Sequence, residues 1–432
     1  MLEGAASKGY FEAAPIMFVR EINMEKEKKK SKKQKKWMRP RHRIIENIAY
    51  YVLYPYCKWK YAMRIDKLQN QEDRPYLILM NHQTPFDQFF VGMAFKRPLY
   101  YMATEDIFSL GWVSKLLRWL VAPIPIKKQT VDLNAIMTCM RLAREGGSIV
   151  IAPEGNRTYS GKTEYMNPSI AGMARKLKMP IALFRLEGGY GSQPRWSDGI
   201  RKGKLHGYVY EVIQPEEYEK LTNEELFSRI EKGLYVDEAV ADGPFRSKKK
   251  AEFIERAMYV CPWCGLSEFE SHGNEAHCKT CGRKISYGED KVITGEGCEF
   301  PYRFVKDWYE YQKDYINQLD LTAFEQTPAY TDTVDFSEVI VYKKKVPIRK
   351  GIQLGLYGNR MVIDEGTPLE QVLEFDKINA MSVLGHNKLN VYYEKHVYQF
   401  KGSKRHNSVK YLNFYHRYKN VQRGEGETFL GL

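Results

Sequence analysis

The chain has 432 residues, of which 43% are hydrophobic and 13% aromatic, so it can build hydrophobic cores and is not disordered throughout. Its length suggests two or three domains. The mean hydropathy is −0.53, and no uncharged apolar run approaches the roughly 18 residues of a membrane-spanning helix. Nothing at the N-terminus has the pattern of a secretory signal. Seven cysteines, four of them in two C-x-x-C pairs, indicate metal binding in a reducing compartment, so we expect a cytoplasmic protein.

Most of the formal net charge of +14 lies in one N-terminal stretch. Residues 24–43 contain eight lysines and three arginines against two glutamates, a net charge of +9. We interpret residues 1–43 as a disordered basic arm. Such an arm suits nucleic acid or an anionic membrane surface, where each basic residue contributes about 1 kcal/mol.

An apolar and aromatic segment at residues 44–54 follows the arm and runs into Lys58, Trp59 and Lys60. Tyrosines and a tryptophan beside lysines are typical of a helix lying in the lipid headgroup layer. We therefore interpret residues 44–69 as an interfacial amphipathic helix, which favours a protein peripheral on the inner face of the cell membrane. The alternative is an ordinary buried helix with a solvated lysine tail.

Between residues 70 and 240, short apolar runs alternate with helical stretches. Three runs have the features of buried strands, at residues 76–80, 148–152 and 180–185. Helices are expected between them, at residues 131–144 and 170–177. Thr222, with Glu225 three residues later, forms a capping box that predicts the start of a closing helix. This alternation predicts an α/β domain.

The rest of the chain is expected to hold three further parts. Residues 241–258 are interpreted as a linker, and the two cysteine pairs fall within residues 259–290. Residues 300–432 contain alternating runs separated by Gly and Asn turns and end in an expected helix at 408–418, which predicts a mostly β C-terminal module. Its pattern loosely resembles a pleckstrin-homology-like barrel. Such a module could dock the protein on lipid or on a partner.

The first expected strand runs directly into the sequence N-H-Q-T-P-F-D, residues 81–87. Thr84 suits the N-cap of a helix, with Pro85 at its first position and Asp87 one turn in. His82 can then approach the carboxylate of Asp87, which would set its tautomer and stabilise its protonated form. Because no serine or cysteine nucleophile stands nearby, the pair suits proton removal from a substrate hydroxyl. The alternative is that Asp87 only caps the helix.

The second expected strand ends in the sequence A-P-E-G-N-R-T, residues 152–158. Gly155 permits a close approach of the backbone, and Arg157 can bind a phosphate through its planar guanidinium group. Glu154 can orient a hydroxyl or the arginine. The alternative is a surface ion pair between Glu154 and Arg157 in a turn.

Together the two motifs resemble the glycerolipid acyltransferase family of the lysophosphatidic-acid type, whose signatures are N-H-x-x-x-x-D followed by a P-E-G-x-R block. Both stand in the right order, about 70 residues apart, and the resemblance covers residues 70–240. It implies that His82 is a general base and that Asp87 orients it. It also implies that the acceptor alkoxide attacks the thioester of an acyl-CoA or an acyl-carrier protein.

The resemblance further implies an acceptor pocket formed by Glu154, Gly155 and Arg157, with Arg157 against the glycerol phosphate. Between the two motifs the family has an apolar stretch ending in a basic residue, which the sequence I-P-I-K-K matches. There Lys128, or alternatively Lys127, would bind phosphate as a point charge where arginine is usual.

A further family block, built around a proline in an apolar run, matches Met179-Pro180-Ile181. The sequence departs from the family at Asn156, where threonine is commoner, and at Ala152, where phenylalanine is commoner. These departures leave the acceptor and the acyl-chain length open and do not change the expected chemistry.

The two cysteine pairs, C-P-W-C-G and C-K-T-C-G, are separated by 13 residues. Their glycines help the backbone turn in each knuckle, and four thiolates satisfy tetrahedral zinc with no open position. The pattern resembles a zinc ribbon and predicts a structural zinc ion. A redox role would instead need one C-x-x-C beside a helix. The expected ligands are Cys261, Cys264, Cys278 and Cys281, with His272 and His277 as possible competitors.

A zinc ribbon beside a basic arm keeps nucleic-acid binding open as a second class of function. Aromatic residues interleaved with basic ones would indicate it. Between the first and the last of these cysteines only Trp263 and Phe269 are aromatic, among Glu268, Glu270 and Glu275. This acidic surface makes nucleic acid an unfavourable partner.

We therefore expect an α/β acyltransferase domain, a zinc ribbon and a mostly β C-terminal module in a peripheral membrane enzyme. The expected reaction transfers a fatty acyl chain to the free hydroxyl of the lysophospholipid 1-acylglycerol 3-phosphate, giving phosphatidic acid. The alternative acceptors are another lysophospholipid or glycerol 3-phosphate, because the motifs report the reaction class and not the walls of the pocket.

Overall fold

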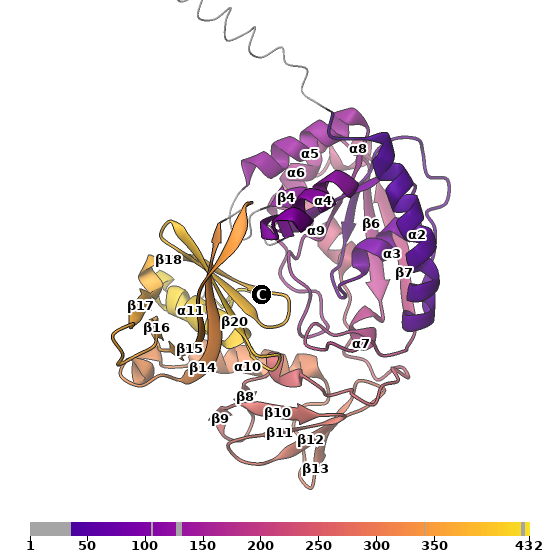
Figure 1. Ribbon diagram of the computed structural model, residues 1–432. Helices are drawn as coiled ribbons and strands as arrows, with labels where there is room; N and C mark the ends of the chain where they lie inside the picture. Colours follow the sequence, from indigo (N-terminus) through magenta and orange to yellow (C-terminus); the bar gives the residue numbers. More distant parts are fainter. Residues whose placement is uncertain (1–35, 105–106, 127–131, 341, 425–427) are drawn as a thin grey trace, which may run out of the picture.

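The computed structural model describes residues 36–104, 107–126, 132–340, 342–424 and 428–432 (Figure 1). A seven-stranded sheet in the order β1-β7-β6-β2-β5-β3-β4 forms the centre of the first part of the chain. Neighbouring strands are parallel except for β6 and β7. The strands are β1 Met63–Ile65, β2 Leu77–Met80, β3 Leu99–Thr104, β4 Ile124–Ile126, β5 Ser148–Ile151, β6 Ile181–Glu187 and β7 Leu205–Ile213.

Both faces of this sheet are buried. Leu77 and Leu79 of β2 lie in one core, whereas Ile78 and Met80 lie in the other. The first core includes residues of α5, α6 and α9, and the second includes residues of α2 and α3. Burial on both faces explains why these strands stand out in the sequence as short, unbroken apolar runs. The helices are α2 Pro40–Tyr61, α3 Asp87–Ala94, α4 Trp112–Leu120, α5 Leu133–Glu145, α6 Ser169–Leu177, α7 Gly189–Ser192, α8 Pro215–Tyr218 and α9 Asn223–Leu234.

The structure confirms the expected α/β arrangement. The three predicted strands correspond to β2, β5 and β6, and the predicted helices correspond to α5 and α6. Thr222 is the N-cap of α9 and forms the predicted capping box with Glu225. Strands β1, β3, β4 and β7 were not predicted.

Helix α2 differs at both ends from the interfacial helix expected at residues 44–69. It begins at Pro40, inside the range 1–43 assigned to the basic arm, of which residues 1–35 lie outside the described part. It ends at Tyr61, because Ala62 adopts the left-handed conformation with φ 46° and residues 63–65 pair with β7 as strand β1. Among the described residues, no helix combines the length and the apolar character that a bilayer span requires.

The cysteine region contains a two-stranded hairpin and a four-stranded antiparallel sheet in the order β10-β11-β12-β13. It extends to residue 296, beyond the expected limit of 290. Its strands are β8 Val260–Cys261, β9 Gly265–Leu266, β10 Phe269–His272, β11 Glu275–Cys278, β12 Lys284–Tyr287 and β13 Ile293–Glu296.

The C-terminal module is a seven-stranded antiparallel sheet in the order β17-β16-β15-β14-β20-β19-β18, with helix α11 Val409–Arg423 packed on it. This agrees with the expected β-rich module ending in a helix. The module begins, however, with helix α10 Val305–Gln318, which was not predicted. The strands are β14 Tyr330–Ile340, β15 Lys344–Leu356, β16 Arg360–Ile363, β17 Gln371–Glu374, β18 Ile378–Leu384, β19 Lys388–Tyr393 and β20 His396–Gly402.

The expected linker at residues 241–258 is packed rather than free. Ala251, Ile254 and Ala257 are fully buried and belong to one core with the cysteine region and the C-terminal module. Tyr159 and Trp196 of the α/β domain belong to the same core. Figure 1 shows the C-terminal sheet beside the α/β domain and the cysteine region below both. The three parts therefore share a continuous interior.

Candidate active site and cysteine cluster

His82 and Asp87 are in contact at the carboxyl end of β2. Nδ1 of His82 lies 2.8 Å from Oδ2 of Asp87, and the side chains are 25% and 1% exposed, respectively. When Nδ1 donates its proton to the carboxylate, Nε2 carries the lone pair and is the atom able to accept a proton. His82 also lines a large cleft. The pair thus has the geometry of an oriented general base.

Asp87 is fixed by three further donors. The N–H groups of Gln83 and Thr84 donate to its carboxylate over 2.7 and 2.9 Å, and the Thr84 hydroxyl donates over 2.6 Å. The prediction of Thr84 as the helix N-cap is wrong, because α3 begins at Asp87 with Phe86 in the N-cap position. Thr84 Oγ1 accepts instead from the Phe86 N–H, over 3.1 Å. The whole loop is therefore folded around the Asp87 carboxylate.

The second motif is hydrogen-bonded to the first through the backbone of His82. Oε1 of Glu154 accepts from the His82 N–H over 2.8 Å, and the Thr158 N–H donates to the His82 carbonyl over 3.1 Å. Oε2 of Glu154 accepts from the Glu164 N–H over 3.0 Å. Burial raises the pKa of Glu154 to about 8. Glu154 lines the cleft, both of its oxygens accept from the backbone, and no ion pair joins it to Arg157 among the described residues.

Gly155 and Arg157 complete the second loop. Gly155 has φ +66°, a left-handed conformation that glycine adopts without strain. Arg157 lines the cleft, and its Nη1 atom is buried with no hydrogen-bond partner among the described residues. Burial, together with the charge of Arg195, lowers the pKa of Arg157 to about 10, so the side chain remains cationic at neutral pH. An unpartnered guanidinium N–H in a cleft suits an anionic ligand.

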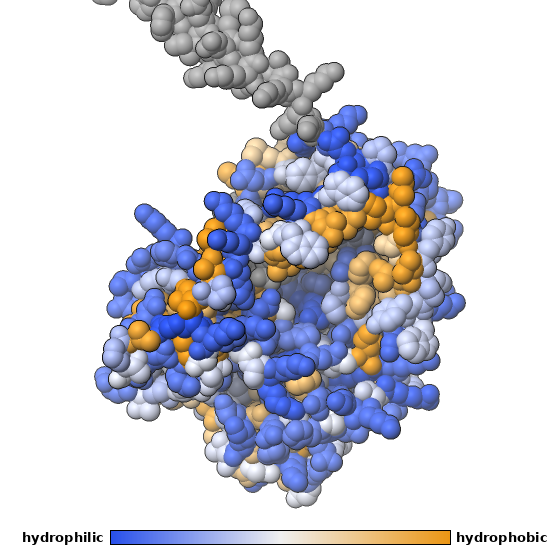
Figure 2. Space-filling model, viewed as in Figure 1, coloured by the Kyte–Doolittle hydropathy of each residue, from blue (hydrophilic) through white to orange (hydrophobic). Residues whose placement is uncertain are grey.

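The cleft has a volume of about 1320 Å³, which exceeds the 300–1,000 Å³ that is usual for small-molecule pockets. Polar groups of the two loops meet at His82, whereas the walls from α2, α3, α4, α5 and α6 are largely apolar. Figure 2 shows a hollow bordered above and on the right by apolar residues. The cleft is thus shaped for a long apolar ligand with a polar end. Its apolar lining includes Leu53, Phe89, Met93, Leu117, Ile136 and Met173.

Two other matches from the sequence remain to be placed. Lys127 and Lys128 fall outside the described residues, although strand β4, which immediately precedes them, ends at a residue of the cleft wall, Ile126. Pro180 precedes β6 and accepts from the N–H of Leu77 at the opposite edge of the sheet from His82. Its carbonyl thus joins the start of β6 to the start of β2.

Several cleft residues carried no signal in the sequence. Phe429, Gly431 and Leu432, which follow α11, line the cleft about 350 residues after His82 in the chain. Tyr165 also lines it, and its ring lies 5.1 Å from that of Phe429. Because these contacts depend on the packing of the C-terminal module against the α/β domain, no local pattern could predict them.

The four predicted metal ligands come together. The thiol sulfurs of Cys261, Cys264, Cys278 and Cys281 all lie within 4.8 Å of one another. Cys261 and Cys281 are 3.7 Å apart, and Cys264 and Cys278 are 3.5 Å apart. Sulfurs bound tetrahedrally to zinc at about 2.3 Å would be separated by about 3.8 Å, so the donor set fits this ion.

The turns around the cysteines agree with the predicted knuckles. Gly265 and Gly282 both have positive φ, +78° and +72°. The N–H of Cys281 donates to the sulfur of Cys278 over 3.5 Å. His272 is exposed and contacts Glu270 instead, with Nε2 3.0 Å from the carboxylate, and among the described residues neither His272 nor His277 joins the cluster.

Comparison with known proteins finds similarity over the part of the chain that carries both motifs. Residues 62–184, which include both motifs, match the family model described as "Acyltransferase". The chain is 24% identical over 192 residues to the chloroplastic 1-acyl-sn-glycerol-3-phosphate acyltransferase LPAT1 of Arabidopsis thaliana, covering 42% of this chain and 51% of that protein. It is 26% identical over 180 residues to the corresponding BAT2 protein of Brassica napus, covering 40% and 48%. The chain therefore spans about half the length of these two relatives.

A bacterial relative is covered more completely. The 1-acyl-sn-glycerol-3-phosphate acyltransferase of Bacillus subtilis is 22% identical over 174 residues, covering 39% of this chain and 83% of that protein. Among solved structures, the 1-acyl-sn-glycerophosphate acyltransferase PlsC of Thermotoga maritima matches with 18% identity and a TM-score of 0.37, covering 45% of this chain and 75% of that one.

Proposed function

We propose that this chain, whose residues 62–184 form an acyltransferase-family domain, transfers a fatty acyl group from a thioester to the free hydroxyl of 1-acylglycerol 3-phosphate, making phosphatidic acid. The observation that carries the proposal is the hydrogen-bonded pair of His82 and Asp87, with His82 facing a large, mainly apolar cleft. The three relatives described above are named as acyltransferases of this acceptor.

In the proposed mechanism, the oxygen of the acceptor hydroxyl attacks the carbonyl carbon of the thioester while Nε2 of His82 accepts the hydroxyl proton. The new C–O bond forms, the C–S bond breaks, and the departing thiolate takes the proton back from His82. Asp87 keeps Nδ1 protonated and stabilises the imidazolium that forms in between. General-base help of this kind contributes about 10²–10⁴ in rate.

We assign Arg157 to the phosphate of the acceptor, because its Nη1 atom is buried, unpartnered and part of the cleft lining. We assign Glu154 a different role from the one that the family resemblance implies. Since its two oxygens bind backbone N–H groups of His82 and Glu164, it positions the loop of the base rather than the substrate. The apolar walls would hold the acyl chain of an acyl-CoA or acyl-carrier protein donor.

We further propose that α2 and α4 place the cleft at an anionic membrane surface, such as the inner face of the cell membrane. Large apolar side chains on both helices are exposed, and they border the hollow in Figure 2. Tryptophans and tyrosines among them suit the headgroup layer. Such a surface would deliver a lysophospholipid directly to His82. The exposed residues include Ile44, Ile48, Tyr51, Val52 and Trp59 of α2, and Trp112, Leu116 and Trp119 of α4.

The cysteine cluster is proposed to hold one structural zinc ion. The ion would tie the β8–β9 turn to β11, leaving no open position for chemistry. The order of strands in the C-terminal module, with β14 pairing with both β15 and β20 and α11 packed on the sheet, supports a pleckstrin-homology-like barrel.

The experiment that tests the proposed function incubates the purified full chain with palmitoyl-CoA and each of three acceptors: 1-acylglycerol 3-phosphate, 1-acylglycerophosphocholine and glycerol 3-phosphate. Products are identified by mass spectrometry. We expect phosphatidic acid from the first acceptor as the main product. Faster acylation of either other acceptor would reject the assigned substrate, and no product with any acceptor or with palmitoyl-acyl-carrier protein would reject the proposed function.

A further inference from the structure

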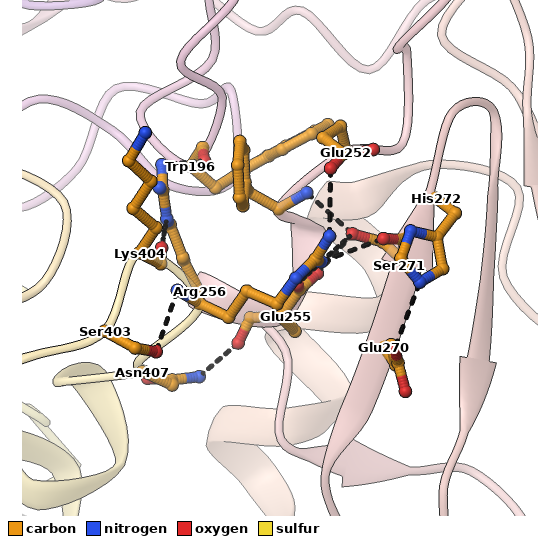
Figure 3. A network of polar contacts seen from close by, with 12 residues as sticks. Trp196, Glu252, Glu255, Arg256, Glu270, Ser271, His272, Ser403, Lys404 and Asn407 are labelled. Carbon is orange, nitrogen blue, oxygen red and sulfur yellow. Dashed lines mark hydrogen bonds and ion pairs between the residues drawn. The ribbon is translucent and has the colours of Figure 1, made fainter. Parts of the chain in front are cut away.

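The loop that follows α7 in the α/β domain is the contact point of all three parts of the chain. Arg256, which precedes the cysteine region and is 2% exposed, donates to the Trp196 carbonyl over 2.9 Å and to the Lys404 carbonyl over 2.6 Å. Figure 3 shows it reaching between these two residues. It also pairs with Asp198 over 2.6 Å. The loop thus fixes where the C-terminal module meets the α/β domain.

Arg195 of the same loop connects this junction to the active site. It is 3% exposed, and its Nη1 donates to the main-chain carbonyl of Arg157 over 2.9 Å. Its Nη2 donates over 3.1 Å to the carbonyl of Val383, in strand β18 of the C-terminal module. The guanidinium carbon lies 4.3 Å from the centre of the Tyr159 ring. One buried side chain therefore spans from β18 to the backbone of Arg157.

A neighbouring contact strengthens the same link. Just beyond β18, Nδ1 of His386 lies 2.7 Å from the carboxylate of Asp198, which is also paired with Arg256. Two adjacent points of the C-terminal module, Val383 and His386, are thus tied to the loop that carries Arg195.

Resting on the proposed function, we propose that Arg195 is a positioning residue through which the C-terminal module holds Arg157 in the orientation that binds the acceptor phosphate. The Nη1 atom of Arg157 has no hydrogen-bond partner among the described residues. The direction in which the guanidinium group points therefore depends on the position of the Arg157 backbone. Binding groups must be held within about 0.5 Å of their productive position. A planar guanidinium can donate to two carbonyls in fixed directions, which a lysine cannot do.

The test compares Arg195→Lys with the wild type and with Arg405→Lys. Arg405 lies at the same junction, where it pairs with Glu252 over 2.9 Å and donates to the Ser271 carbonyl over 2.8 Å, but no contact links it to Arg157. KM and kcat are measured for 1-acylglycerol 3-phosphate and for palmitoyl-CoA. We expect Arg195→Lys to raise KM for the phosphate acceptor about tenfold, with kcat and the donor KM within about twofold of the wild type.

A merely structural defect would lower the amount of active enzyme and hence kcat, and would leave KM unchanged. Arg405→Lys is expected to show at most that pattern. An unchanged acceptor KM in Arg195→Lys, or the same change in both variants, would overturn the proposal while leaving the proposed function intact.

Binding of the short-chain probe 1-hexanoylglycerol 3-phosphate, measured by calorimetry, separates the two claims. Wild-type binding that is weakened about tenfold by Arg195→Lys supports the positioning role even if no acyl transfer occurs, in which case only the proposed function fails. Binding that is equal in the two proteins contradicts the positioning role. No binding to the wild type contradicts both claims.

Discussion

The main-chain N–H of His82 donates to Oε1 of Glu154 over 2.8 Å, across 72 residues of sequence. The His82 loop and the second motif are therefore one structural unit, joined again where the Thr158 N–H donates to the His82 carbonyl. Both motifs follow buried, adjacent parallel strands, β2 and β5. Their carboxyl ends meet at one edge of the sheet, so the two loops can share hydrogen bonds.

We expect Asp87→Asn to lower kcat by about 10²–10⁴ with little change in KM, because an amide N–H facing Nδ1 would favour the wrong tautomer of His82. Steady-state kinetics with palmitoyl-CoA and 1-acylglycerol 3-phosphate measure the effect. Asp73→Asn, which breaks only a surface pair with Lys96, serves as the control and is expected to keep full activity. Activity retained in Asp87→Asn would show that Asp87 only holds the loop.

The burial of Glu154 predicts a pH dependence of stability. Its pKa is raised to about 8 in the folded protein, against an ordinary value of 4.5. Between these values the folded state binds more protons than the unfolded state, so the free energy of unfolding falls as the pH rises from about 5 to 8. Glu154→Gln removes this titration and is expected to flatten the dependence, as measured by urea denaturation at several pH values. The exposed Glu219→Gln is the control, and parallel curves for all three proteins would contradict the account.

Substitution of an exposed tryptophan on α4 tests the proposed membrane-binding surface. Trp112→Ser is expected to weaken binding to vesicles of phosphatidylglycerol and phosphatidylcholine about tenfold, because burying an aromatic side chain stabilises by at least about 1.4 kcal/mol. Trp112 is 73% exposed, and Leu369→Ser, at a residue 61% exposed on the C-terminal module, is the matched control. Equal loss of binding in both variants in a sedimentation assay would show that the surface is not specific.

The metal content of the purified protein tests the proposal that the cysteine cluster holds one structural zinc ion. We expect one zinc ion per chain by mass spectrometry, lost in Cys281→Ser but kept in Cys298→Ser, whose thiol lies outside the cluster. Because the ion would tie the two turns together, its removal by a chelator should also lower the melting temperature. A metal-free protein with an unchanged melting temperature in chelator would contradict a structural zinc site.

The sequence predicts the local features of this molecule well and its long-range ones poorly. The strands β2 and β5 appear as apolar runs because they are buried on both faces, and the His82 and Glu154 loops follow them directly. The four cysteines are likewise identified by their spacing. Each of these features depends on residues close together in the chain.

Features that depend on packing between distant segments could not be predicted. Residues 241–258 look like a linker because they are rich in charge, yet Ala251 and Ile254 belong to the shared core. Helix α10 is rich in polar residues, so its sequence does not reveal that one of its faces is buried. The contact of Arg195 with Val383 and the lining of the cleft by Phe429 exist only once the C-terminal module has docked.

The most direct test of the central claim is thiol release from palmitoyl-CoA by the purified chain, with and without 1-acylglycerol 3-phosphate, in wild type and His82→Ala. The account predicts release that depends on the acceptor and falls by at least about 10² in His82→Ala, while circular dichroism shows both proteins equally folded. Acceptor-dependent release that is unchanged by the loss of His82 would contradict it, because the proposed proton acceptor would then not be needed.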